Sequence, residues 1–225
     1  YLKSNLIGFF NILQLTKINK IKNFIYASSS SVYGDQVNSK FIEDDTSANN
    51  PGQFYAATKR SNEIIAKSYS NLYGINTIGL RYFTVYGPYG RPDMSIFKFT
   101  KNILENKKIE VFNFGKHKRD FTYIDDAAEL TIRLIKKLNL SKKKVSEVFN
   151  ISRGSSIQLM KIIRLLEVNL SMKAQIKYLP KQKGDVVSTH GNNEKVKKYT
   201  KFFKFTKPED GISRFVKWYL EYFNK

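Results

Sequence analysis

The feature that most constrains the fold is an alternation of helical and extended segments near the start of the sequence. Apolar residues recur at helical intervals over 2–15 and again over 54–73, and Gly74 follows the second segment where a helix C-cap is expected. Residues 23–27 and 76–83 are short apolar segments typical of buried strands. The order helix, strand, helix, strand predicts an α/β fold with a parallel, doubly wound sheet.

The alternation becomes less regular beyond Gly90. Helices are predicted over 94–104, from a cap at Asp125 or Asp126 to 138, over 156–168 and over 208–223, and extended segments over 109–114 and 121–124. We therefore divide the chain near residue 86. Residues 87–225 are expected to form mainly a smaller, mixed α/β substrate lobe, with some return to the first domain.

One signature of doubly wound domains is missing from the sequence. In such domains a G-x-G-x-x-G turn between strand and helix cradles the diphosphate of a dinucleotide, and a later acidic residue holds its ribose. Neither feature occurs in these 225 residues. We therefore expect residues 1–86 to be the C-terminal half of a dinucleotide-binding domain, whose sheet lacks its first half.

Composition excludes several classes of protein. The chain is 41% hydrophobic, which is enough for one sizeable core, and it contains no cysteine, so disulfides and thiolate metal sites are excluded. His117 and His190 lie far apart, and no metal site is predicted. There is neither a signal peptide nor an apolar run of the roughly 18 residues needed to span a membrane. These features predict a soluble, cytoplasmic protein.

The net charge of +20 raises the alternative of a basic, nucleic-acid-binding protein. The lysines of the chain, however, are spread along its whole length. Arginine, the residue that most often contacts the base edges of DNA, is scarce at eight residues. This distribution argues against nucleic-acid binding as the main function, which we keep as a remote alternative.

Tyr55 and Lys59 are the first candidates for chemistry. They stand four positions apart near the start of the helix predicted over 54–73, so their side chains share one helix face. An ammonium beside a phenol favours the phenolate, which can act as a general base. The spacing alone is weak evidence, because a chain this rich in tyrosine and lysine contains such pairs by chance.

The surroundings of this pair strengthen the interpretation. Ser28 to Ser31 follow the first predicted strand, and the second strand ends in the turn Val85-Tyr86-Gly87-Pro88. In a parallel sheet the carboxyl ends of the strands form the crevice where ligands bind. The sequence therefore predicts that these polar segments meet beside the helix that carries Tyr55.

Three segments in this order resemble one known family. They are S-S-S-x-V-Y-G at 28–34, Y-x-x-x-K at 55–59 and R-Y-F-x-V-Y-G-P at 81–88, and shorter similarities lie at 4–8, at 119–126 and in Gly184-Asp185-Val186. The chain thus resembles the extended short-chain dehydrogenase/reductases, in the branch of NAD-dependent nucleotide-sugar epimerases and dehydratases. The resemblance implies a partial Rossmann-like sheet and NAD as the cofactor.

The resemblance also implies roles for individual residues. Tyr55 would take the proton from the sugar hydroxyl, Lys59 would hold the nicotinamide ribose, and Ser29 would hydrogen-bond the same sugar hydroxyl. The cofactor-binding residues would be Asn5, Ala27, Ser28, Tyr55, Lys59, Tyr82 and Phe83. The substrate-binding residues would be Ser29, Ser30, Ser31, Thr84, Arg91, Phe112, Arg119 and Asp185. In this set Arg119 would pair with the diphosphate, Phe112 would wall the uracil, and Asp185 would close the pocket.

The serine segment bears on the reaction. The dehydratases of this branch carry T-D-E there, whereas this chain has Ser29-Ser30-Ser31, which favours 4-epimerisation by hydride transfer through a 4-keto intermediate. Residues 84–94 are similar to the pattern of UDP-glucuronate 4-epimerases, and Arg91 with Thr84 could hold a C6 carboxylate. His190-Gly191-Asn192 departs from the family, which has an aromatic-Ala-Asp run there.

The leading hypothesis is therefore a UDP-glucuronate 4-epimerase of polysaccharide synthesis, forming a homodimer through the helices at 2–15 and 54–73. Two competing hypotheses stay open beside nucleic-acid binding. The first is a truncated, non-catalytic relic, or a fragment that needs a complementary N-terminal half. The second is a 4-epimerase of UDP-glucose or of a UDP-N-acetylhexosamine.

Overall fold

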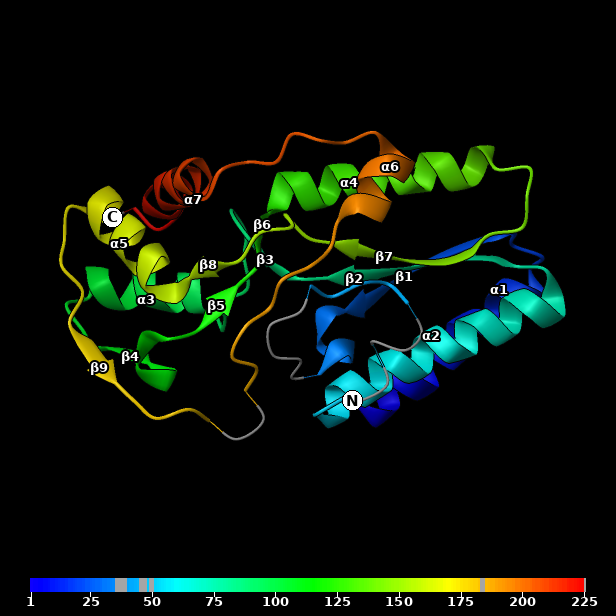
Figure 1. Cartoon of the computed structure of the whole chain (residues 1–225), viewed down its shortest axis with the longest axis horizontal. Helices are drawn as coiled ribbons and strands as arrows, with labels where there is room; N and C mark the ends of the chain where they lie inside the picture. Colours follow the sequence, from blue (N-terminus) through cyan, green and yellow to red (C-terminus); the bar gives the residue numbers. More distant parts are fainter. Residues whose placement is uncertain (35–39, 45–47, 49–50, 183–184, 225) are drawn as a thin grey trace.

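The structure, a computed structural model, describes residues 1–34, 40–44, 48, 51–182 and 185–224. At the centre of the described chain lies a parallel sheet in the strand order β1 (Asn23–Ser29), β2 (Asn76–Tyr82), β7 (Ser146–Ile151) (Figure 1). β1 and β2 pair in register from Asn23 opposite Asn76 to Ser29 opposite Tyr82, so both strands end at the same edge. The predicted α/β class with a parallel sheet is confirmed.

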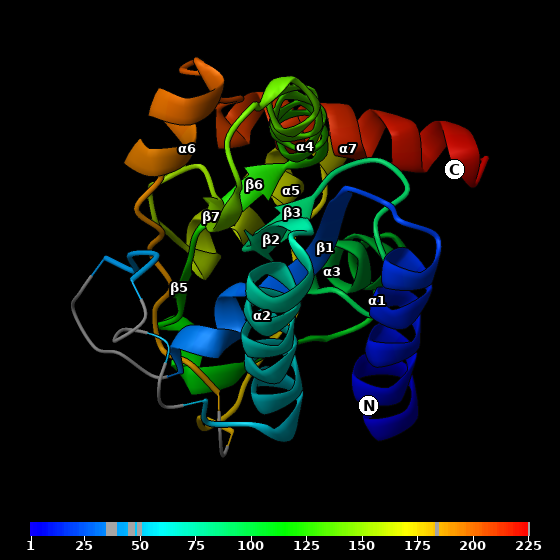
Figure 2. The ribbon, with the colours of Figure 1, turned by 90° about the vertical axis from the view of Figure 1, so that its right-hand side faces the viewer.

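Helices cover both faces of this sheet (Figures 1 and 2). One face carries α1 (Gly8–Ile18) and α2 (Phe54–Tyr73), and the other carries α4 (Ile124–Leu140) and α6 (Glu194–Thr200). Side chains of β2 alternate between the faces: Leu80 packs in a cluster with Leu130 and Leu134 of α4, whereas Arg81 contacts α2. The sheet is thus buried on both sides.

A second core lies beside the sheet, under α3 (Ser95–Leu104), α5 (Leu159–Leu170) and α7 (Pro208–Tyr222). Short strand pairs flank it: β3 (Thr84–Tyr86) with β6 (Phe121–Tyr123), β4 (Ile109–Val111) with β9 (Ile176–Tyr178), and β5 (Lys118–Arg119) with β8 (Ile157–Gln158). β7 and α6 come after α3 in the sequence, and α6 also comes after α5, yet both pack against the parallel sheet. The chain therefore passes back and forth between the two regions. The division at residue 86 stays a prediction.

The first half of the chain follows the sequence pattern closely. α2 has the predicted bounds, and Gly74 ends it in a left-handed conformation with φ of +68°. β1 runs two residues further than predicted, to Ser29. The helix predicted over 2–15 is a π-helix, η1 (Leu2–Ile7), followed by α1, which continues to Ile18.

Several expectations for the second half were wrong. The extended segment predicted over 109–114 ends at Val111, because Asn113 and Phe114 adopt positive φ in the turn η3 (Phe112–Gly115). α4 has Tyr123 at its N-cap, without a side-chain cap, and Asp126 instead accepts hydrogen bonds from Thr206. The helix predicted over 156–168 is α5, which starts later, after the short strand β8.

No helix in the described ranges is long and apolar enough to cross a membrane. Gly184, the first residue of the Gly-Asp-Val motif, lies outside the described residues.

Candidate active site

The Tyr55–Lys59 pair lies at the start of α2, next to the end of β1. Lys59 Nζ is 5.9 Å from the centroid of the Tyr55 ring and donates a 2.9 Å hydrogen bond to the carbonyl oxygen of Ala27. Partial burial lowers the pKa of the Lys59 ammonium. The structure therefore brings together the phenol, the ammonium and the strand end, as a general base and its charged neighbour require.

The first turn of α2 is held from the N-terminal side. Asn5 Nδ2 donates to Thr58 Oγ1 at 3.0 Å, and Thr58 Oγ1 donates to the carbonyl oxygen of Tyr55 at 2.8 Å. The ring of Tyr1 lies 5.2 Å from the ring of Tyr55, centroid to centroid. Asn5, predicted to lie by the cofactor, thus contacts the helix that carries Tyr55.

The serines divide between two environments. Ser28 is buried and its hydroxyl donates to Glu63 Oε1 at 2.6 Å, beneath α2. Ser29 ends β1 and accepts a 3.1 Å hydrogen bond from the backbone N–H of Ser31, which lies in the turn η2 (Ser30–Tyr33). Ser30 and Ser31 line a cavity at the strand ends.

This cavity has a volume of about 250 Å³ and is lined by several residues that are far apart in the sequence. Five predicted substrate-binding residues are among them: Ser30, Ser31, Thr84, Arg119 and Asp185. Gln53 and Ala56, which flank Tyr55 at the start of α2, line it as well. The cavity therefore connects the helix of the predicted base with the predicted substrate residues; we call it the substrate cavity.

The Asp185 carboxylate, at the wall of the substrate cavity, contacts the side chains of Arg119 and His117. Arg119 Nη2 donates to Asp185 Oδ1 at 2.9 Å, and His117 Nε2 lies 3.0 Å from Asp185 Oδ2. Burial lowers the pKa of His117, the charges of Arg119 and Lys181 lower it further, and the Asp185 carboxylate opposes them. Sequence reasoning missed His117, because a lone histidine without ligand spacing carries no signal of its own.

The remaining predicted residues lie away from the substrate cavity lining. Tyr82 points to the opposite face of the sheet, where its hydroxyl is 2.9 Å from Thr131 Oγ1 of α4. Phe83 is buried against Tyr33 and Phe41. Phe112 starts η3, and Arg91 is an exposed residue that pairs with Asp93 beside a smaller pocket, which Thr84 also lines. Their assigned roles stay predictions.

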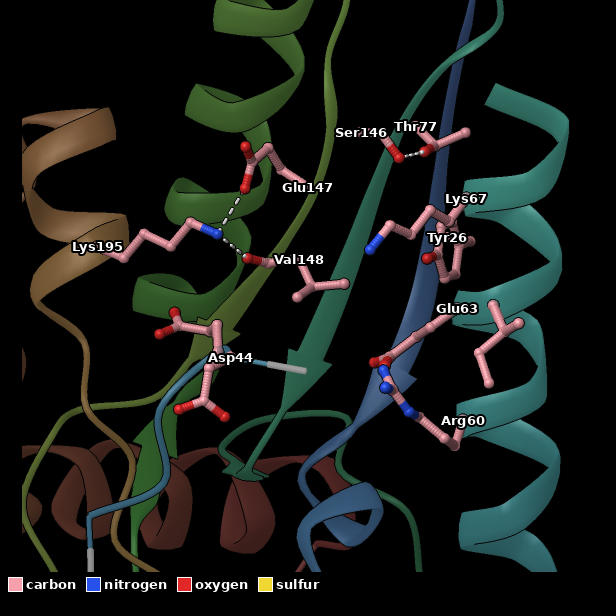
Figure 3. Close-up of a pocket in the computed structure, with 12 residues that line it drawn as sticks. Tyr26, Asp44, Arg60, Glu63, Lys67, Thr77, Ser146, Glu147, Val148 and Lys195 are labelled. Atoms are coloured by element: carbon pink, nitrogen blue, oxygen red, sulfur yellow. Dashed lines mark hydrogen bonds and ion pairs between the residues drawn. The ribbon is translucent and has the colours of Figure 1, made fainter. Parts of the chain in front are cut away.

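A larger cavity of about 550 Å³ lies elsewhere, over β7 on the α2 face of the sheet (Figure 3). None of the predicted site residues lines it. Its walls carry charges of both signs, including Lys195, which pairs with Glu147, and Arg60, which pairs with Glu63 at 3.0 Å. In the described residues no group of three or more histidine, cysteine, aspartate or glutamate side chains could hold a metal ion.

The residues beside β1 fit the ribose of a nicotinamide cofactor. The Ala27 carbonyl takes one of the three N–H donors of Lys59, and an ammonium has the chemistry to bind ribose hydroxyls with the others. A parallel sheet with a Tyr-x-x-x-Lys helix at its carboxyl edge defines an enzyme of the short-chain dehydrogenase/reductase class.

Comparison with known proteins places the chain within this class. The family model described as "NAD dependent epimerase/dehydratase family" matches residues 1–152, and the chain belongs to that family. The predicted family, the enzyme class of NAD-dependent epimerases and the cofactor NAD are thereby confirmed.

Relatives and solved structures agree with this assignment. The chain is 43% identical to Protein CapI of Staphylococcus aureus, covering 100% of this chain and 71% of that protein. It is 39% identical to UDP-glucuronate 4-epimerase 4 of Arabidopsis thaliana, covering 100% of this chain but 54% of that protein. A crystal structure of UDP-glucuronic acid 4-epimerase from Bacillus cereus, in complex with UDP-glucuronic acid and NAD, superposes with a TM-score of 0.90 at 30% identity, covering 99% of this chain and 69% of that one.

Proposed function

We propose that the protein carrying this chain is an NAD-dependent UDP-sugar 4-epimerase that converts UDP-glucuronate to UDP-galacturonate. The observation that carries the proposal is the substrate cavity, which joins Ser30, Ser31, Thr84, Arg119 and Asp185 beside the helix of Tyr55. The similarity to UDP-glucuronate 4-epimerases supports the same reaction.

In this proposal Tyr55 acts as the base that takes the proton from the C4 hydroxyl of the sugar and later returns it. Bound NAD supplies the acceptor, and then the donor, of the hydride at C4. Lys59, fixed on the Ala27 carbonyl, places its positive charge beside the neighbouring tyrosine and binds the nicotinamide ribose. Ser29 donates to the same C4 oxygen, which orients it for proton transfer.

The substrate cavity provides for both ends of the substrate. Arg119 offers a planar, multi-donor cation to the diphosphate, and Asp185 fixes its orientation by the 2.9 Å hydrogen bond. At the sugar end, Thr84, Ser30 and Ser31 offer hydroxyls to the C6 carboxylate. Arg91 and Thr84 both line a smaller pocket, and in this proposal Arg91 supplies the positive charge that distinguishes a uronate from a neutral sugar.

The test is turnover of UDP-sugars by the protein that contains this sequence, and by its Tyr55→Phe variant. We expect Tyr55→Phe to lower kcat by roughly 10²- to 10⁴-fold with little change in UDP binding, because a proton-transfer group is lost. Arg91→Met should raise KM for UDP-glucuronate and leave binding of UDP unchanged.

Unchanged turnover of the Tyr55→Phe variant would remove this residue from the mechanism. Turnover of UDP-glucose or of a UDP-N-acetylhexosamine, with none of UDP-glucuronate, would replace the substrate. A protein without any epimerase turnover would favour the non-catalytic alternative.

We also propose a homodimer that pairs α1 and α2 with the same helices of a second copy. Both helices expose large apolar side chains, among them Phe10 and Leu15 of α1 and Leu72 of α2. Leu72→Lys should shift sedimentation toward the monomer, whereas the matched control Leu140→Lys, on the exposed end of α4, should not. A monomeric wild-type protein at micromolar concentration would contradict the proposal.

A further inference from the structure

A cluster of buried polar side chains lies behind the active-site helix, and the ion pair at its centre takes no part in the proposed chemistry. Its members come from different elements: Ser28 on β1, Tyr33 on η2, Glu63 on α2, Arg81 on β2 and Asn150 on β7. Arg81 and Asn150 are 0% exposed and Glu63 is 4% exposed. Charged side chains are almost never buried this deeply unless they are paired. We call this group the buried polar cluster.

The ion pair at the centre of the cluster satisfies both charges. Arg81 Nε and Nη2 donate to Oε1 and Oε2 of Glu63, each at 2.8 Å, and Arg81 Nη1 donates to the Tyr33 hydroxyl at 2.9 Å. The carboxylate also accepts from Ser28 Oγ at 2.6 Å and from Arg60 Nη1 at 3.0 Å. Burial raises the pKa of Glu63, but the hydrogen bonds and charge of Arg81 outweigh it, so the pKa lies below its ordinary value. The pair therefore stays charged.

The cluster contacts the helix face that carries the reaction. Glu63 is four positions after Lys59 and eight after Tyr55, so the three side chains follow one another along the same face of α2. Ser28, which donates to Glu63, directly follows Ala27, which accepts from Lys59. Because Lys59 Nζ lies at the end of a long side chain, far from the helix axis, a rotation of α2 about that axis would move it away from the Ala27 carbonyl oxygen, to which it is bonded at 2.9 Å.

The cluster also reaches the wall of the substrate cavity. The Tyr33 hydroxyl donates to Asn150 Oδ1 at 2.7 Å, and Asn150 Nδ2 donates to the carbonyl oxygens of Phe41 at 2.8 Å and Asn192 at 3.0 Å. Phe41 lines the substrate cavity. One hydrogen-bonded network thus connects the active-site helix, the sheet and the cavity wall.

We propose that the Glu63–Arg81 ion pair is a positioning element of the active site, which fixes the rotation of α2 so that Lys59 stays on the Ala27 carbonyl beside Tyr55. The inference rests on the proposed function, because it gives the pair a role in that reaction. A pair that served stability alone could be replaced by uncharged side chains of similar volume without effect on catalysis. A positioning pair could not.

The test is the double variant Glu63→Gln/Arg81→Met in the protein that contains this sequence. Glutamine keeps an acceptor for Ser28, methionine keeps most of the buried volume, and neither member of the pair is left as an unpaired buried charge. We expect kcat to fall by about 10- to 100-fold, since small displacements of catalytic groups have effects of this order. KM for the UDP-sugar should change little, because the cavity residues are retained.

The pH profile provides a readout that stability alone would not move. Tyr55 faces Lys59 on its own helix, Arg91 on the loop after β3, and Tyr1 before η1. Of these three residues, Lys59 lies on α2 one helical turn from Glu63 of the buried polar cluster. When its ammonium is less well placed, the charge beside the reacting groups changes, and the acidic limb of the kcat–pH profile of the double variant should move away from its wild-type position.

A third readout needs neither cofactor nor turnover. The pH dependence of Lys59 acylation, followed by mass spectrometry of the labelled peptide, reports the pKa of its ammonium. Burial lowers that pKa in the native protein. In the double variant we expect it to rise toward the ordinary value of about 10.4, because Lys59 is released to solvent.

The matched control is Lys161→Met/Glu209→Gln, which removes an exposed ion pair between α5 and α7 and should leave all three readouts unchanged. If the double variant fails to fold, Arg81→Lys keeps the charge but loses the bidentate geometry, and a smaller loss of kcat with a smaller rise in the Lys59 pKa is expected. Wild-type kcat, pH profile and Lys59 pKa in the folded variant would overturn the proposal. If the wild-type protein lacks turnover, the proposed function fails, and the Lys59 titration alone decides on positioning.

Discussion

Removing one partner of the Glu63–Arg81 pair should destabilise the fold far more than removing both. In Arg81→Met the Glu63 carboxylate, which is 4% exposed in the native protein, would keep Ser28 and the partly buried Arg60 as its donors. Removing one partner of a buried pair costs about 3–5 kcal/mol of unfolding free energy, and we expect the lower end for Arg81→Met because Arg60 still pairs with Glu63. Glu63→Gln leaves the fully buried Arg81 guanidinium without its counter-ion, with a cost of the same order.

The double variant Glu63→Gln/Arg81→Met should lose less than about 2 kcal/mol, because neither buried charge is left alone. A double-mutant cycle over these variants should therefore give a favourable coupling of at least about 4 kcal/mol, which is large for two neighbouring residues.

Urea unfolding at pH 7, followed by far-UV circular dichroism, measures each value, provided that the m values of the variants agree with wild type. A loss below about 1 kcal/mol in Arg81→Met would refute the reasoning, and so would a double variant as unstable as the single ones. Either result would mean that the buried charges are compensated by groups other than each other.

Three further predictions address other parts of the molecule. Lys59→Met should lower kcat and weaken NAD binding, measured by isothermal titration in the protein that contains this sequence, while UDP binding persists. In wild type, burial holds the pKa of His117 below its value in the unfolded chain, so the unfolded chain takes up the proton first and the unfolding free energy falls as pH drops below about 6.5. In His117→Gln this fall should be less steep. Equal slopes of unfolding free energy against pH, between pH 7 and 5, in the two proteins would contradict this. Gly87→Ala should cost about 1–3 kcal/mol in urea unfolding, because Gly87 has a φ of +144° and an added Cβ would lie 2.4 Å from Ile124 Cγ2; a neutral effect would show that the turn relaxes.

Sequence periodicity predicted the helices and strands that have a regular apolar pattern of their own. α2 was predicted with the bounds it has because its apolar stripe is regular and Gly74 ends it. β7 (Ser146–Ile151) was missed, because its apolar residues follow a lysine-rich segment and the strand is recognisable by its partner β2, not by its own pattern. α6 (Glu194–Thr200) was missed because this short, basic helix buries little beyond Val196 and Thr200.

The candidate site shows the same division. The predicted residues of the substrate cavity came from the family resemblance, and the structure brings Ser30, Thr84 and Arg119 together at one cavity. The buried ion pair was not predicted, because periodicity assigns charged residues to solvent and cannot show that Glu63 and Arg81 face each other. A signal did exist: Arg81 interrupts the apolar strand of 76–83, where an unpaired charge could not be buried.

Stability alone gives little reason for a charged pair in this place. Apolar side chains of similar volume are often as stabilising as a buried ion pair, or more so, because desolvation of two charges offsets most of their attraction. Apolar contacts, however, tolerate sliding and rotation, whereas the bidentate bond between Arg81 and Glu63 is satisfied in one orientation of α2. The ion pair therefore differs from an apolar contact in that it fixes the orientation of α2. Tyr55 and Lys59 require a fixed orientation of α2, because they must meet a substrate and a cofactor at fixed positions. Tyr55 lies two turns, and Lys59 one turn, away from Glu63 on the same helix face.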